Sequence, residues 1–404
     1  MEIVKIILLT IPYVLASPAT GLEEKALELL DKTDIIASTP HALESLVDPY
    51  NNEVNMKRPE QLSVIGLLQK QLIGESESDW KLACVPRPWQ LPRGDEEDDP
   101  LLTAQKHAMP NIAVPDPVCP GSKLYFPEMF LSVYAEQSIE TVPSTDNIAS
   151  IILRDALVDT INILDYNRNA TAKFLVDTDC YFPVGTFVKR ATPFDRLREV
   201  AGERSTWKPE DVAVDAVFSQ LFQLPSPEHK LIYYHSVLTE SCKIAPAAIA
   251  PSLGRAIRYL YKHVDRMDLE LVYRFMDWFA HHLSNFGFTW KWTEWIGDVV
   301  FPPMHPKKAF MIGALDKEIR LSFAQRIRGT LPEPYQPLIP AVKEKDTPDF
   351  KYDADGTVTF ALLSHVGIAT TNPQLCQTLR SQPKVAPCLR YFAKKRRNPI
   401  SSQS

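Results

Sequence analysis

The chain has little glycine and few cysteines. Only 14 of its 404 residues are Gly, against 34 Pro. This balance favours helices separated by stiff loops and argues against a protein rich in β-hairpins. No two cysteines have the C-x-x-C spacing of a zinc site, and their scatter argues against a disulfide framework and favours reduced thiols in a nuclear or cytosolic protein. The six are Cys84, Cys119, Cys180, Cys242, Cys376 and Cys388.

The sequence also lacks an excess of positive charge and the common catalytic motifs. The net charge of −6 argues against a broad surface that binds nucleic-acid phosphates, so any contact with RNA is expected through a partner. No stretch reaches the length of about 18–20 apolar residues that a membrane span needs. No P-loop, dinucleotide fingerprint, nucleophile elbow or H-E-x-x-H motif is present. We therefore expect no enzyme, no cofactor and no membrane.

Two pairs of polar residues could suggest a metal site. His281 and His282 are adjacent, and adjacent side chains on a helix point about 100° apart, so the pair cannot chelate one ion. Glu294 and Asp298 could share a helix face, but no His or Cys stands at ligand spacing beside them. We expect satisfied histidines and solvated carboxylates, and no metal site.

The N-terminus allows two interpretations. Lys5 followed by the apolar residues 6–15 resembles a short signal peptide, and Asn169-Ala170-Thr171 is a glycosylation sequon. A secreted helical protein is therefore one alternative. Glu2 weakens the positive charge, however, and Pro12 interrupts the apolar stretch. The favoured interpretation is an amphipathic or buried helix over Ile3–Val14, inside a domain whose earlier part is missing.

Apolar residues recur at helical spacing over much of the remaining chain, and prolines separate the segments. The predicted helices include one with Leu22, Ala26, Leu29 and Leu30 on one face, one starting near Pro209, and one capped by Asp268. The Asp268 helix has the apolar face Leu271, Phe275, Trp278 and Phe279; a later helix carries Phe310, Leu315, Ile319, Phe323 and Ile327 and closes at Gly329. The spacing predicts an all-α fold, an armadillo- or HEAT-like α-solenoid of antiparallel helix pairs. Proline and the acidic run 95–99 suggest an exposed linker over 83–122.

Residues 275–295 hold eight aromatic side chains, including four of the seven tryptophans. The first interpretation is core packing between helices, because so much ring area needs to be buried. The second is a surface that binds a protein partner, since Trp is frequent at interface hot spots. RNA base stacking is the third and weakest, because Lys291 is the one Lys or Arg in the run.

Six segments stand out in their order along the chain: Tyr125–Pro143, Ala172–Phe182, Val217–His229, Arg274–Trp295, Pro306–Ile327 and Leu331–Tyr335. Together they resemble the large subunit of the nuclear cap-binding complex, in a fungal-like version, and the resemblance covers roughly residues 1–350. It implies helical domains that resemble the middle domain of initiation factor 4G. By this resemblance, residues 1–115 are the end of a first domain with its linker, 120–335 are a complete second domain, and 336–404 are the start of a third followed by an irregular basic tail.

The resemblance also implies a function. The large subunit does not itself bind the 7-methylguanosine cap; it supports a small RRM subunit that does, and it links capped RNA to RNA-processing and export factors in splicing, export and nonsense-mediated decay. A nuclear protein is expected, with shuttling to the cytoplasm possible. Partner binding is expected at Trp290, Lys291, Trp292 and Trp295. The run Lys394, Lys395, Arg396, Arg397 is either a nuclear import signal or a disordered basic tail.

Much of the first and third domains of that family is expected to be missing. This predicts impaired small-subunit binding, and uncovered apolar faces that lower solubility. A cytoplasmic, translation-type helical scaffold remains an alternative to the nuclear one.

Overall fold

The computed structural model describes residues 2–50, 63–87, 125–200 and 205–339, with a few isolated positions between 105 and 113. Residues 1–340 form one compact unit; the second, 341–404, lies outside the described residues and includes the basic run Lys394–Arg397. The described residues are helices and loops with two isolated β-bridges and no strand. The predicted all-α class is therefore confirmed. None of the described helices is long and apolar enough to cross a membrane.

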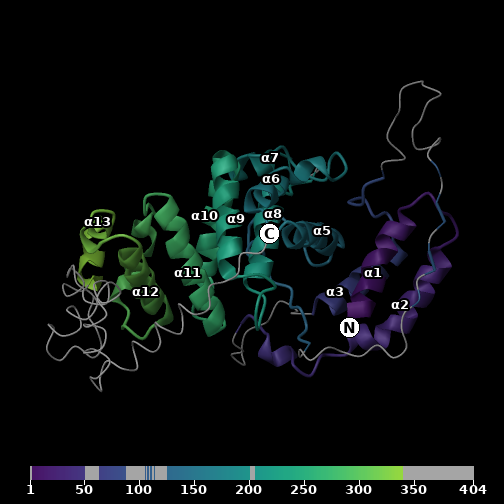
Figure 1. Ribbon diagram of the computed structural model, residues 1–404, viewed down its shortest axis with the longest axis horizontal. Coiled ribbons are helices and arrows are strands. Elements are labelled where there is room, and N and C mark those ends of the chain that lie inside the picture. Colours follow the sequence, from purple (N-terminus) through teal and green to yellow (C-terminus); the bar gives the residue numbers. More distant parts are fainter. Residues whose placement is uncertain are drawn as a thin grey trace, which may run out of the picture. The chain divides into compact units, whose positions relative to one another are not determined.

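A first group of three helices comes from the N-terminal part of the chain (Figure 1). Its members are α1 (Glu2–Leu15), α2 (Glu23–Ser38) and α3 (Val64–Glu77), which pack on one another. Helix α1 buries Val4, Leu8 and Ile11, so the apolar N-terminus is the partly buried helix that the second interpretation predicts. Its opposite side leaves Ile6 and other apolar side chains exposed.

The buried face of α2 differs from the predicted one. Ala26 and Leu30 are buried, together with Thr33 and Ala37, whereas Leu29 is 38% exposed. The spacing 26, 30, 33, 37 follows one side of a helix with 3.6 residues per turn, and Leu29 falls at the edge of that side. The prediction from apolar spacing that Leu29 belongs to the buried face of α2 is therefore wrong.

The second group of helices begins after residue 144 and contains the aromatic segment. Its α-helices are α5 (Ala149–Ile163), α6 (Arg168–Val176), α7 (Leu197–Val200), α8 (Pro209–Leu221), α9 (Leu231–Ile244), α10 (Pro246–His263), α11 (Leu269–Asn285), α12 (Pro306–Leu321) and α13 (Ala324–Arg328). Its 3₁₀ segments are η3 (Thr178–Cys180), η4 (Phe194–Arg196), η5 (Trp292–Val300) and η6 (Glu333–Leu338). Pro209 and Pro246 occupy first-turn positions, where their missing N–H has no intrahelical partner to lose. The Asp268 carboxylate caps α11 by accepting the Glu270 N–H at 2.8 Å, as predicted.

The predicted long helix through Phe323 is wrong, because two helices occupy this region. Helix α12 ends at Leu321, and the extended backbone of Phe323 separates it from α13. Ile327 is a buried residue of α13, whereas Phe323 is 58% exposed. Gly329 follows α13 with φ −67°, so it does not provide the left-handed C′ residue that the sequence suggested.

One apolar core runs through both groups of helices. Polar contacts also join them: the Gln71 side chain of α3 donates to the Thr145 carbonyl at 2.6 Å and to the Ser150 hydroxyl at 2.8 Å. The Pro49 carbonyl accepts the Asp268 N–H at 2.9 Å, next to the start of α11. The N-terminal segment is thus attached to the helix that carries the aromatic residues.

Candidate partner-binding site

The aromatic segment mainly builds the core. The Asp268 cap fixes the register of α11, which turns Phe275, Trp278 and Phe279 inward, each fully buried. The chain then turns at Gly287, whose φ is +70°, and the segment 290–295, which leads into η5, places further rings against Phe279. Their ring centroids lie 5.8–5.9 Å from that of Phe279, and they belong to Trp290, Trp292 and Trp295. The core-packing interpretation is confirmed for these residues.

The four residues expected to bind a partner have different environments. Trp292 and Trp295 are only 1% and 5% exposed, so they offer no surface to a partner. The Tyr335 hydroxyl donates to the Trp292 carbonyl at 2.8 Å, and the Tyr261 ring stacks on Trp295 with centroids 3.8 Å apart. The expectation is thereby corrected for Trp292 and Trp295, because neighbouring helices already cover both rings.

Trp290 is half-buried and the Lys291 side chain is 70% exposed, so these two do reach the surface. The Arg258 guanidinium of α10 lies 5.3 Å above the Trp290 ring centroid. It also donates two hydrogen bonds to the Glu294 carboxylate, at 2.7 and 2.9 Å. We call Arg258, Trp290, Lys291 and Glu294 the Trp290 patch.

The Trp290 patch carries one more positive charge than negative charge. Hydrogen bonding from Arg258, with a smaller contribution from Lys291 at 3.4 Å, lowers the pKa of Glu294. One carboxylate therefore faces two cations. The patch combines an indole face, a planar guanidinium and an exposed ammonium, which are groups that suit a protein interface.

The predicted solvated carboxylates are in fact paired. Asp298 accepts the Tyr261 hydroxyl at 2.8 Å and lies 3.8 Å from the Lys307 ammonium. The two histidines contact different neighbours: the His282 ring stacks on Trp278, and His281 lies beside His235 of α9. Within the described residues no cluster of three His, Cys, Asp or Glu side chains could hold a metal ion.

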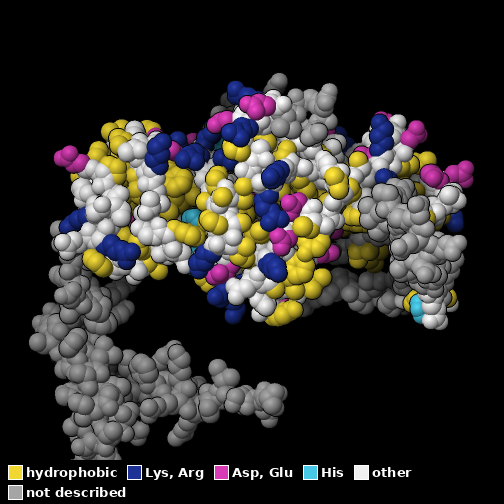
Figure 2. Space-filling model, turned by 90° about the horizontal axis from the view of Figure 1, so that it is seen from above, with side chains coloured by type: hydrophobic (Ala, Val, Ile, Leu, Met, Phe, Trp, Pro, Cys, Tyr) yellow, Lys and Arg dark blue, Asp and Glu magenta, His cyan; other side chains and the backbone are white. Residues whose placement is uncertain are grey.

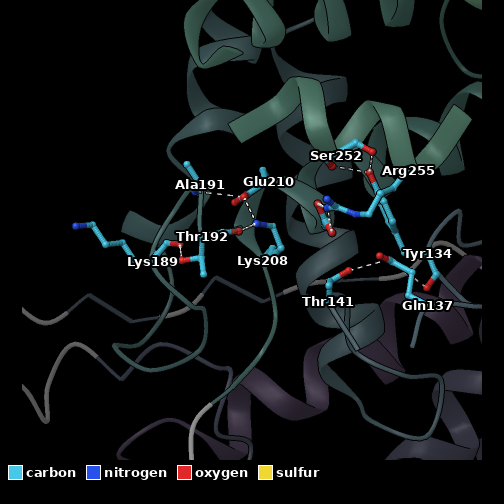
Figure 3. Close-up of polar contacts among 11 residues, drawn as sticks. Tyr134, Gln137, Thr141, Lys189, Ala191, Thr192, Lys208, Glu210, Ser252 and Arg255 are labelled. Carbon is cyan, nitrogen blue, oxygen red and sulfur yellow. Dashed lines mark hydrogen bonds and ion pairs between the residues drawn. The ribbon is translucent and has the colours of Figure 1, made fainter. Parts of the chain in front are cut away.

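Sequence reasoning missed a buried polar network at the start of α8, shown in Figure 3. The Lys208 ammonium and the Glu210 carboxylate lie 2.8 Å apart, and both side chains are almost fully buried. Lys208 also donates to the Thr192 carbonyl, and Glu210 accepts the Ala191 N–H at 3.2 Å. These contacts hold Ala191 in a left-handed conformation with φ +62°.

A separate ion pair joins α8 to α10. Arg255 donates two hydrogen bonds to the Asp211 carboxylate, and near it the Tyr134 hydroxyl bonds to Ser252 at 2.6 Å (Figure 3). Arg255 and Asp211 are far apart along the chain, whereas Lys208 and Glu210 lie within a short charged run. No local sequence motif therefore marks either pair. Each charged group has an opposite partner, which suits a structural role in fixing the 189–192 loop.

With this geometry described, comparison with known proteins defines the class of the chain. Residues 143–333 match the family described as MIF4G like. The matched region starts just before α5 and ends within η6, so it contains the Trp290 patch and the α8 network. The chain therefore contains a MIF4G-like helical domain, in agreement with the all-α solenoid fold.

Curated relatives then identify the family more narrowly. The chain is 35% identical over 350 residues to nuclear cap-binding protein subunit 1 of Schizosaccharomyces pombe. The matched region covers 86% of this chain and 44% of that protein. The nuclear cap-binding protein complex subunit 1 of Saccharomyces cerevisiae is 32% identical, in a match that covers 52% of this chain and 25% of that protein. That of Eremothecium gossypii is 33% identical, in a match that covers 54% of this chain and 24% of that protein. The chain is thus homologous to nuclear cap-binding protein subunit 1, which confirms the resemblance. It spans less than half the length of these relatives.

Proposed function

We propose that the chain acts as a non-enzymatic scaffold within a nuclear cap-binding complex. The homology over 86% of the chain carries this proposal, and two of the relatives are named as subunit 1 of a nuclear cap-binding protein complex. The helical core supports it, since a stack of helices offers an extended surface for partners. In the face seen in Figure 2, Lys and Arg side chains are interspersed with acidic and apolar ones, which favours RNA contact through a partner.

The partner we propose is a small RRM subunit that binds the 7-methylguanosine cap. The same proposal includes roles in splicing, export and nonsense-mediated decay of capped RNA. It also includes a nuclear location, with shuttling to the cytoplasm. We propose the Trp290 patch as part of the partner surface, because an exposed cation beside a half-buried indole can contribute a hot spot without disturbing the core. The domain boundaries near 115 and 335 and the import role of Lys394–Arg397 stay predictions.

A pull-down with the small RRM subunit tests this function. The chain and the full-length S. pombe relative are compared, each with and without a cap analogue. We expect specific but weaker binding by the chain, strengthened when the cap analogue is present. No detectable binding under conditions where the relative binds would contradict the scaffold proposal.

Two variants test the site separately. Trp290→Ala with Lys291→Glu should weaken binding about tenfold or more, because an indole anchor is lost and a charge is reversed. Glu228→Lys, an exposed charge reversal between α8 and α9, is the control. Equal binding by the patch variant and the control removes the Trp290 patch from the interface while leaving the scaffold proposal standing.

A cytoplasmic, translation-type scaffold is the second candidate. The MIF4G-like match favours it as well, since that match by itself does not specify the complex. Capture of an initiation helicase in preference to the RRM subunit would support this alternative.

A further inference from the structure

Helix α2 exposes an outer side that is both apolar and acidic. Of its 16 residues, only Ala26, Leu30, Thr33 and Ala37 are buried, and these face α1 and α3. The other positions are exposed, and α2 lies beside α1 in the N-terminal group (Figure 1). The helix therefore has one packed side, and the structure places nothing described on the rest of it.

Four residues of this outer side lie on one face. Leu27, Asp31, Asp34 and Ile35 stand at positions i, i+4, i+7 and i+8, a spacing that aligns side chains along a helix. Ile35 is 78% exposed and Leu27 is 48% exposed. A face that serves only solvation usually carries charged residues rather than Ile at such a position. We call these four residues the α2 outer face.

The carboxylates of the α2 outer face have no cationic partner among the described residues. The Lys32 ammonium lies 2.5 Å from the Glu28 carboxylate, so this cation of α2 is paired with Glu28 and not with Asp31 or Asp34. Asp34 accepts the Ser38 hydroxyl at 2.8 Å and forms no other hydrogen bond or ion pair within the described part of the chain. Asp31 forms no ion pair with any described side chain. The face thus presents negative charge between two exposed apolar side chains.

We propose that the α2 outer face binds a basic segment of a partner protein. Apolar side chains of that segment would cover Leu27 and Ile35, and its Lys or Arg side chains would pair with Asp31 and Asp34. Charge complementarity selects this occupant, because carboxylates repel RNA phosphates and anionic lipid head groups. The inference is independent of the proposed partner surface, since no residue of the Trp290 patch lies on α2.

The probe is a fluorescein-labelled peptide of Leu and Lys, 16 residues long to match α2, with leucines at helical spacing. A peptide with Glu in place of every Lys is its matched control. Lys394, Lys395, Arg396 and Arg397 are replaced by Gln in every protein used, so that the chain's own basic run cannot compete. Fluorescence anisotropy follows binding at low and high salt.

We expect saturable binding of the Lys peptide that weakens with salt, and none of the Glu peptide. Asp31→Lys with Asp34→Lys should weaken binding about tenfold, because two attractions become repulsions. The control Glu228→Lys with Asp265→Lys makes the same change in net charge at exposed positions elsewhere and should bind as the parent does.

Leu27→Ser with Ile35→Ser should weaken binding several-fold and reduce its salt dependence little, since apolar contact is lost and charge is kept. All four positions are exposed, and circular dichroism checks that each variant stays helical. A peptide with Ser in place of its leucines provides the same test from the other side. Absence of saturable binding, or equal loss in the control variant, would overturn the proposal.

Discussion

Glu318 provides the sharpest test of the core. Its side chain is fully buried in α12, neither carboxyl oxygen has a hydrogen-bond partner among the described residues, and burial raises its pKa from 4.5 to about 8. A buried carboxyl group without a partner stays protonated, since the charged form is poorly solvated there. The unfolded chain ionises the same group near its ordinary pKa.

The sign of the pH effect follows from this difference. Below pH 4.5 both states hold the proton, and the group does not favour either one. Between pH 4.5 and about 8 only the unfolded state releases it, so the free energy of unfolding falls as pH rises. At about 1.4 kcal/mol per pKa unit, Glu318 lowers the free energy of unfolding by about 3 kcal/mol at pH 7.

Glu318→Gln removes this titration while keeping the shape of the side chain. Urea unfolding at pH 5 and pH 8 should show that the variant gains about 3 kcal/mol relative to the parent as pH rises across that interval. Glu333→Gln, at an exposed position in η6, is the control and should show no such gain. An unchanged pH dependence in Glu318→Gln would refute the assignment of a neutral buried carboxyl group.

Three further predictions concern the same helices. Trp292→Ala should destabilise the fold by about 3–5 kcal/mol, seen as a lower Tm, because it opens a cavity under Tyr335 and Phe279; a loss below about 1 kcal/mol would contradict its core role. Asp268→Ala should reduce stability by about 1 kcal/mol through loss of the α11 cap, whereas Asp268→Asn should retain most of it. Burial lowers the pKa of His282 to about 4, so stability should fall between pH 6.5 and 4 as the unfolded state takes up a proton. His282→Gln should flatten that acid limb, and a parallel pH profile would exclude His282 as its source.

Helical spacing and capping residues were sufficient to predict a helix that buries one face of its own against the core. The face of α11 and its Asp268 cap follow from helical spacing and from a short acceptor side chain before an apolar run. The break before α13 could not be predicted in this way. Phe323 continues the apolar spacing of α12, so only its extended backbone in the folded chain reveals that it lies outside a helix.

The ion pairs of α8 were hidden for a different reason. Lys208 and Glu210 read as surface charges in a sequence, because such residues are seldom buried. Their burial depends on the 189–192 loop reaching across to accept and donate backbone hydrogen bonds. Tertiary contacts of this kind leave no periodic signal, and the same is true of the Arg255–Asp211 pair between α8 and α10.

The aromatic segment shows why an identifying sequence and a binding surface need not coincide. Its tryptophans are recognisable because the core requires large rings at Trp292 and Trp295, and that same requirement removes both from the surface. What remains exposed, Lys291 beside Trp290, acquires its geometry from Arg258, which lies far away in the sequence. A partner that binds here would therefore recognise how α10 packs against η5, so core substitutions that shift this packing should weaken binding without touching the partner.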